Sequence, residues 1–252
     1  MDIFLPENVF SKILSRSLRN QANLNFIFVP AALLSKKLSE NKEAISLIPT
    51  MDLINHPDFY VSRKVGLTFD ESISNSYIYF KRSEDKIKEI VLAGDVSSNE
   101  GILTKILFNE TYGVEVELLF EKINGGTPSQ SQVLVGDRNF IEGNLSSAIS
   151  FTEEIIELIS APYVNFVFAS QSDLKLKELH SRYFELIASI IASEIFEEIN
   201  NNYPLDSQNY LIENLQHVMF NFDEQDIEGI KLLLQLPYFH GIVGDLIEVK
   251  FV

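Results

Sequence analysis

A polar stretch that follows the apolar run "KEIVLAG" combines side chains suited to binding a carboxylate. Ser97, Ser98 and Asn99 precede a helical pattern, so their hydroxyl and backbone N–H groups are expected at the positive end of a helix. The same residues also fit a capping box, in which Ser97 and Glu100 bond to the helix backbone. Both interpretations stay open, and a negative Glu100 would weaken the binding of a dianion.

A second polar stretch, Asp137 and Arg138, follows the apolar run "SQVLVG". If that run is a parallel strand, its carboxyl end is where open α/β sheets bind their ligands. Asp137 would then accept a hydrogen bond from a ligand, whereas Arg138 is expected at the surface. The alternative is a turn in which Asp137 bonds to its own backbone. Thr50 follows the apolar run "AISLIP" and either donates its hydroxyl to a ligand or caps the next segment.

Composition excludes several classes of function. The chain has 252 residues, and 36 Asp and Glu against 20 Lys and Arg give a formal net charge of −16. An acidic chain without a basic cluster is not expected to bind nucleic acid or anionic membrane surfaces. Cysteine is absent and the four histidines lack metal-ligand spacing, so we expect no disulfide and no metal site. The N-terminus does not resemble a secretory signal and no apolar run is long enough to span a membrane, which predicts a cytoplasmic protein.

Short apolar runs alternate with helical patterns along most of the chain. In the first fifty residues the runs "DIFL", "LNFIFV" and "AISLIP" enclose the helical patterns "VFSKILSRSL" and "AALLSKKLSEN". This order predicts parallel βαβ units, and a second set of strands and helices follows. We therefore predict an α/β fold with two lobes and a cleft between them. Lobe I comprises residues 1–82 and 170–252, and the inserted lobe II comprises 83–169, with "SYIYFKR" and "YVNFVFAS" as the extended crossings.

The pattern after residue 173 is helical. Apolar residues from Leu179 to Ile199 recur at steps of three and four, which predicts one helix of about six turns. Two more helices are expected at "SQNYLIENLQHVMF" and "EQDIEGIKLLLQL", the latter with Asp223 as its N-cap.

Six segments of the sequence are similar, in the same order, to those of a known family. They are "AISLIPTMDLI", "SISNSYIYF", "SSNEGILTKIL", "VLVGDRNF", "FTEEIIELISAPYVNFVFA" and "YLIENLQHVMFNFDEQDIEGIKLL". The family they resemble is the menaquinone-biosynthesis family of the futalosine pathway, whose best-known member is chorismate dehydratase. The resemblance implies a two-lobed, periplasmic-binding-protein-like (type II) fold, a cytoplasmic enzyme and no cofactor. It also implies that Ser76, on the crossing strand, faces the cleft.

The chain departs from that family at the end of its first strand. In "IFLPEN", Pro6 takes the place of the family's substrate-facing Asn, and Glu7 and Asn8 are the candidates to replace it. One hypothesis is a chorismate dehydratase-like lyase that binds a small carboxylate, chorismate or a relative, in the cleft. The alternative is a non-catalytic small-carboxylate-binding protein of the same fold that has lost the catalytic Asn. A sister enzyme of the pathway, acting on a dehypoxanthine futalosine derivative, is a third hypothesis.

Overall fold

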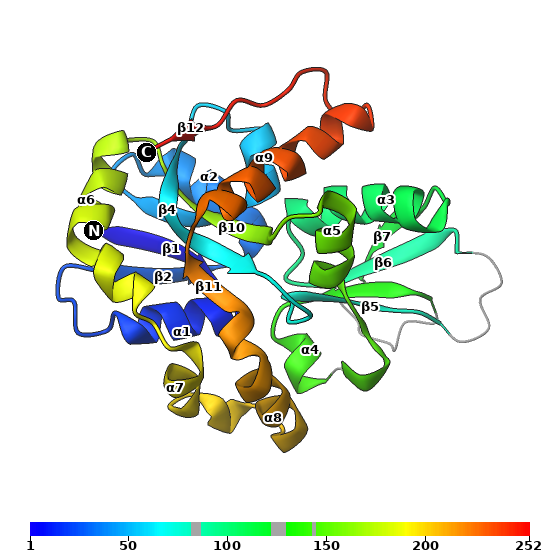
Figure 1. Cartoon of the computed structure of the whole chain (residues 1–252), viewed down its shortest axis with the longest axis horizontal. Coiled ribbons are helices and arrows are strands. Elements are labelled where there is room, and N and C mark those ends of the chain that lie inside the picture. Colours follow the sequence, from blue (N-terminus) through cyan, green and yellow to red (C-terminus); the bar gives the residue numbers. More distant parts are fainter. Residues whose placement is uncertain (82–86, 122–129, 143–144) are drawn as a thin grey trace.

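The strands form two sheets in the computed structural model, which describes residues 1–81, 87–121, 130–142 and 145–252 (Figure 1). The larger sheet has the strand order β11 (Val218–Asn221), β4 (Tyr60–Phe69), β10 (Tyr163–Ser170), β3 (Ile45–Pro49), β1 (Asp2–Pro6) and β2 (Asn25–Val29), with β12 (Lys250–Phe251) also paired to β4. The smaller sheet has the order β7 (Glu117–Phe120), β6 (Glu89–Gly94), β8 (Gln132–Val135), β5 (Ser76–Tyr79) and β9 (Ile149–Ser150).

The first three strands confirm the parallel βαβ arrangement expected from the sequence. β1 pairs in parallel with both β2 and β3. Their carboxyl ends therefore lie side by side at one edge, and each leads into a helical turn. β6 pairs in parallel with β7 and β8 in the smaller sheet, so the ends of β6 and β8 also lie together.

The chain changes sheet earlier than the sequence suggested. β5 pairs with β8 in the smaller sheet, and β10 pairs with β3 and β4 in the larger one. The passages between sheets are therefore 70–75 and 160–162. Of the expected lobe boundaries, 82/83 lies outside the described residues and 169/170 lies within the end of β10, a strand of the larger sheet. The segments expected to cross between lobes are buried strands, whose backbone groups need partners within one sheet.

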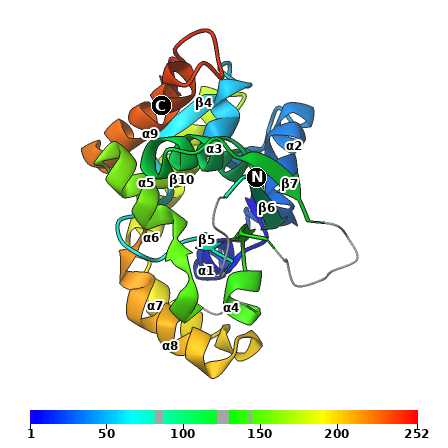
Figure 2. The ribbon, with the colours of Figure 1, turned by 90° about the vertical axis from the view of Figure 1, so that its right-hand side faces the viewer.

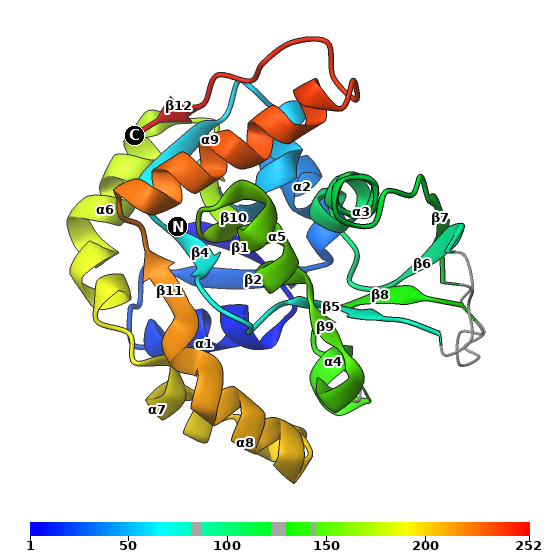
Figure 3. The ribbon, with the colours of Figure 1, turned by 45° about the vertical axis from the view of Figure 1, so that its right-hand side comes forward.

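Helices cover both sheets. They are α1 (Val9–Ser17), α2 (Leu34–Glu40), α3 (Ser98–Tyr112), α4 (Arg138–Ile141), α5 (Phe151–Ile159), α6 (Asp173–Ala188), α7 (Ala192–Glu197), α8 (Leu205–Asn214) and α9 (Glu224–Phe239), with 3-10 turns η1 (Ala31–Leu33), η2 (Thr50–Ile54), η3 (Leu145–Ser147), η4 (Asn200–Asn202) and η5 (Leu215–His217). α1 lies on one side of the larger sheet, and α2 and α9 lie on the other (Figures 1 and 3). Viewed from the smaller sheet, α3 and α5 lie on one side of its strands and α4 on the other (Figure 2).

The C-terminal third differs from the sequence expectation in two places. The single long helix is two helices, because α6 ends at Ala188 and the chain turns through Ile191, which is 55% exposed. Periodicity alone does not distinguish one helix from two that bury the same face. In addition, part of "LQHVMF" forms β11, whose residues alternate between buried and exposed. That period of two is typical of a strand. The predicted N-cap at Asp223 is confirmed, as a capping box with Asp226.

Apolar side chains from both sheets contribute to one buried cluster. Phe10 of α1 packs edge-to-face against Phe69 of β4 and against Phe140 of α4, with ring centroids 5.0 and 6.2 Å apart. The two sheets are thus joined by apolar packing as well as by the chain. None of the helices within the described ranges has both the length and the apolar character required to cross a bilayer.

Candidate functional site

Three adjacent turns of the larger sheet point backbone N–H groups toward the smaller sheet. The N–H groups belong to Val9 at the start of α1 after β1, to Ala31 at the start of η1 after β2, and to Met51, the second residue of η2 after β3. The first N–H groups of a helix have no partner within the helix and carry its positive end. Each of these three N–H groups donates to a side-chain oxygen from the smaller sheet's part of the chain. The strand ends of the two lobes therefore meet.

Asp137 makes the strongest of these contacts. Its Oδ1 accepts from the Val9 N–H at 2.6 Å, and its Oδ2 accepts from Lys12 Nζ at 2.6 Å and from the Tyr203 hydroxyl at 2.9 Å. Burial, followed by the charge of Asp137, raises the pKa of Tyr203, which therefore remains a donor. Hydrogen bonds of a carboxylate to an ammonium group and to a helix N-terminus are short and strong. Asp137 therefore bonds across to the other lobe rather than to its own turn, and its role in a ligand site stays a prediction.

The turn that presents Asp137 is fixed by its neighbours. Gly136 has a φ of 83°, a conformation that side-chain-bearing residues rarely adopt. The Asn139 amide donates to Leu134 O at 2.7 Å and to Gly136 O at 3.1 Å. Arg138 points away from the lobe contact, since it pairs with Glu121 and Glu142 of its own lobe. The three residues that end this strand thus have different roles. Gly136 turns the chain, Asp137 faces the other lobe, and Arg138 faces its own lobe.

Asp95 repeats the same arrangement on the neighbouring strand. It follows Gly94, whose φ is 86°, and its Oδ1 accepts from the Ala31 N–H at 2.9 Å. A Cβ at Gly94 would lie 2.1 Å from the carbonyl oxygen of Val135, so only glycine fits beside β8. Burial raises the pKa of the Asp95 carboxyl to about 6, although the Ala31 hydrogen bond opposes the rise.

Other carboxylates contribute to the raised pKa of Asp95. Glu100, Glu7 and Asp137 all raise it further by charge repulsion. Asp95, Glu100 and Asp137 of the smaller lobe, together with Glu7 of the larger lobe, thus make the junction acidic beside its row of N–H donors.

Asn99 makes the third contact between the lobes. Its Oδ1 accepts from the Met51 N–H at 2.9 Å, and its Nδ2 donates to Asn165 O at 2.6 Å. Because the amide has both a donor and an acceptor, it ties the start of α3 to two elements of the larger sheet. Ser98 begins α3 beside it and is half-buried.

The remaining serine candidates belong to a buried hydrogen-bond network. Ser97 forms the capping box, since its backbone N–H and its hydroxyl both donate to Glu100 Oε2. The Ser76 hydroxyl donates to Glu100 Oε1 at 2.7 Å. Glu100 is 1% exposed, so this network keeps a negative charge buried behind the junction. The capping interpretation of Ser97 describes its contacts in the structure.

Thr50 and the end of β1 serve the larger sheet itself. The Thr50 hydroxyl donates to Val164 O at 2.6 Å. Pro6 ends β1 opposite Val29, and Glu7 is exposed. Asn8 is the N-cap of α1, where its Oδ1 accepts from the Ser11 N–H.

The amide nitrogen of Asn8 is one of several buried polar atoms for which the described residues supply no hydrogen-bond partner. Asn8 is 1% exposed, yet its Nδ2 donates to none of the described residues. A buried donor without an acceptor is costly, so such a group calls for a further partner. Asn8 is the residue before Val9, whose backbone N–H donates to Asp137.

Sequence reasoning missed three members of this site, namely Asp95, Lys12 and Tyr203. A signal existed for Asp95, because Gly94-Asp95 and Gly136-Asp137 repeat the same dipeptide after two apolar runs. No local pattern marked Lys12 or Tyr203, which are brought to Asp137 by tertiary packing. Across the described ranges, no group of three or more His, Asp or Glu side chains is placed to hold a metal ion.

The comparisons with known proteins concern the fold. No family model and no curated protein matches the sequence. Among solved structures, the periplasmic aliphatic sulphonate binding protein SsuA from Escherichia coli superposes with a TM-score of 0.65 and 9% identity, over 99% of this chain and 90% of that one.

Two further structures agree. Protein AF1704 from Archaeoglobus fulgidus has a TM-score of 0.60 and 11% identity, over 96% of this chain and 98% of that one. The zinc-bound ligand-binding component of an ABC-type import system from Staphylococcus aureus has a TM-score of 0.54 and 10% identity, over 99% and 96%. Together with the two sheets, these similarities establish that the chain has the α/β, two-lobed, periplasmic-binding-protein-like fold.

Proposed function

We propose that this chain is a small-molecule-binding protein that holds an organic anion at the junction of its two lobes. The observation that carries the proposal is the position of Asp137. Its carboxylate is held by the Val9 N–H, the Lys12 ammonium and the Tyr203 hydroxyl. A helix N-terminus with a cation and a hydroxyl beside it forms a binding site for a carboxylate or sulfonate group. Asp137 thus occupies the place that we assign to the anionic group of a ligand.

Exchange between Asp137 and a ligand requires the lobes to separate. Two short passages, 70–75 and 160–162, connect them, and rotation about such passages is the usual domain motion of this architecture. The Nδ2 of Asn8, next to Val9, has no acceptor among the described residues and is an additional donor for the ligand. The ligand class named for the Escherichia coli neighbour, aliphatic sulphonates, is also a single anionic group on a small molecule.

The acidic side of the junction favours a ligand with one negative charge. Burial is the main cause of the raised pKa of Asp95, and charge repulsion from Glu100, Glu7 and Asp137 adds to it. A second carboxylate on the ligand would add to this repulsion. The proposed ligand is therefore a monoanion, and chorismate, which carries two carboxylates, is a weaker candidate. Thr50, Ser76 and Ser97 support the site from behind, through their own hydrogen bonds.

The test is chemical rescue of Asp137→Ala. If the carboxylate of Asp137 stands in for a ligand's anion, its removal opens a site for formate. We expect sodium formate to raise the melting temperature of this variant more than sodium chloride of the same ionic strength does. The matched control is Asp245→Ala, which changes the exposed Gly244-Asp245 dipeptide. Equal effects of formate and chloride on Asp137→Ala would contradict the proposal.

Chorismate dehydration remains a second candidate function. The feature that favours it, besides the six similar segments, is Asn8, which is buried at the junction two residues after the family's Asn position. Incubation of the protein with chorismate and chromatography for the benzoate product tests it directly. Absence of product would leave the binding proposal intact. The cytoplasmic location expected from the sequence stays a prediction.

A further inference from the structure

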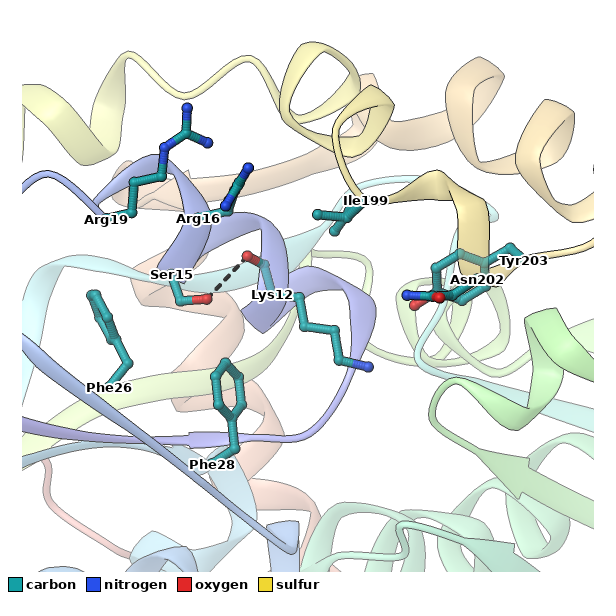
Figure 4. A pocket seen from close by; sticks show the side chains of 9 residues that line it. All are labelled: Lys12, Ser15, Arg16, Arg19, Phe26, Phe28, Ile199, Asn202 and Tyr203. Carbon is teal, nitrogen blue, oxygen red and sulfur yellow. Dashed lines mark hydrogen bonds between the residues drawn. The ribbon is translucent and has the colours of Figure 1, made fainter.

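A cavity lies beside the lobe junction, on the larger lobe. It has a volume of about 510 Å³ and is bounded by α1, β2 and the segment around η4 (Figure 4). This is within the range of sites that hold small organic ligands. The side chains that matter for its chemistry are Lys12, Arg16, Arg19, Phe26, Phe28 and Ile199.

One wall of this cavity, which we call the basic aromatic pocket, gathers positive charge. Lys12, Arg16 and Arg19 are spaced by four and three residues, so they share one face of the first helix and its end. Three cations on one wall are notable in a chain whose net charge is −16.

The charge of this wall is only partly neutralised. Arg16 Nε, at 2.9 Å, and Arg19 Nη1 both donate to the same oxygen, Glu198 Oε2. These contacts take one N–H from each guanidinium, which has five. Hydrogen bonds from Arg19 and Arg16 lower the pKa of Glu198, which is therefore ionised at neutral pH. Two guanidinium groups paired with one carboxylate leave a net positive charge, and their remaining N–H groups can donate to an anion.

The other wall is aromatic. Phe26 and Phe28 are two residues apart on β2, so their side chains stand on the same face of that strand. Figure 4 shows both rings beneath α1, with the guanidinium groups of Arg16 and Arg19 above them in this view. β2 is the last strand of its sheet, and Phe28 is 38% exposed. An exposed ring at the edge of a sheet, inside a cavity, offers a stacking surface for another ring.

We propose that the basic aromatic pocket binds an aromatic monoanion, such as an aryl sulfonate or aryl carboxylate. The ring stacks on Phe26 and Phe28, and the acid group is bound by Arg16 and Arg19, whose planar guanidinium groups match a carboxylate or sulfonate. This site adjoins the lobe junction, because Lys12 and Tyr203 line it and also contact Asp137, but the proposal does not require a ligand at the junction. Lys12 lines the pocket but is already paired with Asp137.

The probe for the test is naphthalenesulfonate, titrated by calorimetry. Methanesulfonate supplies the charge without the ring, and naphthol supplies the ring without the charge. We expect naphthalenesulfonate to bind more tightly than either. Arg19→Gln and Phe28→Ala should each weaken its binding about tenfold, because the first removes a charged donor to the sulfonate and the second removes a ring that stacks on the naphthalene.

The matched control is Arg63→Gln. Like Arg19, Arg63 is an exposed arginine paired with one glutamate, Glu224, but it lies on β4 outside the pocket. Phe28 and Arg19 are both partly exposed, so these variants are expected to fold, and unchanged melting temperatures confirm it. The proposal is overturned if all four proteins bind naphthalenesulfonate equally, or if methanesulfonate or naphthol binds as tightly. Neither substituted residue contacts Asp137, so these outcomes are independent of the formate test at the junction.

Discussion

Replacing Asp95 by Asn should stabilise the protein at neutral and alkaline pH. Burial raises the pKa of Asp95 from 3.8 to about 6, so the folded state binds a proton more tightly than the unfolded state does. The stability linked to this group is therefore fully present below pH 3.8 and is lost as the pH rises through about 6. Asparagine carries no charge to desolvate and keeps the oxygen that accepts from the Ala31 N–H.

The magnitude follows from the size of the pKa shift. A difference of about 2 units corresponds to about 3 kcal/mol, and screening at this partly exposed side chain reduces the expected gain to about 1–2 kcal/mol. The assay is urea unfolding of wild type and Asp95→Asn at a series of pH values, with Asp245→Asn as the control. The variant should be the more stable protein at about pH 8 and equal to wild type at about pH 3. A variant that is less stable than wild type at about pH 8 would refute the reasoning, because the charge would then stabilise the junction.

Two other substitutions test the packing of the larger sheet and the buried network behind the junction. Gly66→Ala places a Cβ 2.7 Å from a backbone carbonyl oxygen and 2.0 Å from the Phe222 ring, so it should lower the free energy of unfolding. We expect urea unfolding to show a loss of roughly 3 kcal/mol in the free energy of unfolding. The control is Gly101→Ala, whose Cβ meets nothing within 4 Å and which should cause no loss. Equal stability of the two variants would contradict the close packing at Gly66. Ser76→Ala removes a donor to the buried Glu100 and should cost about 1–2 kcal/mol in the same assay, so an unchanged midpoint would show that this hydrogen bond contributes nothing.

The parts of the fold that were predictable from sequence are those encoded by local pattern. Three apolar runs alternate with two helical patterns before residue 50, and that order leaves few arrangements other than parallel βαβ units. The Gly136-Asp137 corner was recognisable because a strand ended there. The lobe boundaries were less accessible, since "YVNFVFAS" is mostly apolar without an alternating pattern and does not say which sheet it joins.

The residues that complete the site could not be found in the same way. Lys12 lies on an ordinary amphipathic helix, and Tyr203 follows an Asn-rich turn with no strand nearby. Both residues join the site only because the fold places them against Asp137, which is more than sixty residues away in the sequence. Asp95 is intermediate, because its Gly-Asp dipeptide repeats that of Asp137, but the pairing of β6 with β8 is needed to show that the two carboxylates are neighbours.

If Asp137 competes with the ligand, its removal should increase affinity. A ligand binds at the junction only when the lobes are apart, so its affinity falls in proportion to the fraction of molecules that are open. Hydrogen bonds from an ammonium, a backbone N–H and a hydroxyl to one carboxylate are together expected to add about 2 kcal/mol to the Asp95 and Asn99 contacts that favour the closed form, so their loss raises the small open fraction about 30-fold. Asp137→Ala should therefore bind a small monoanion about 30-fold more tightly than wild type does. Titration of both proteins with formate measures the ratio, and an affinity that falls in the variant would show that Asp137 assists ligand binding.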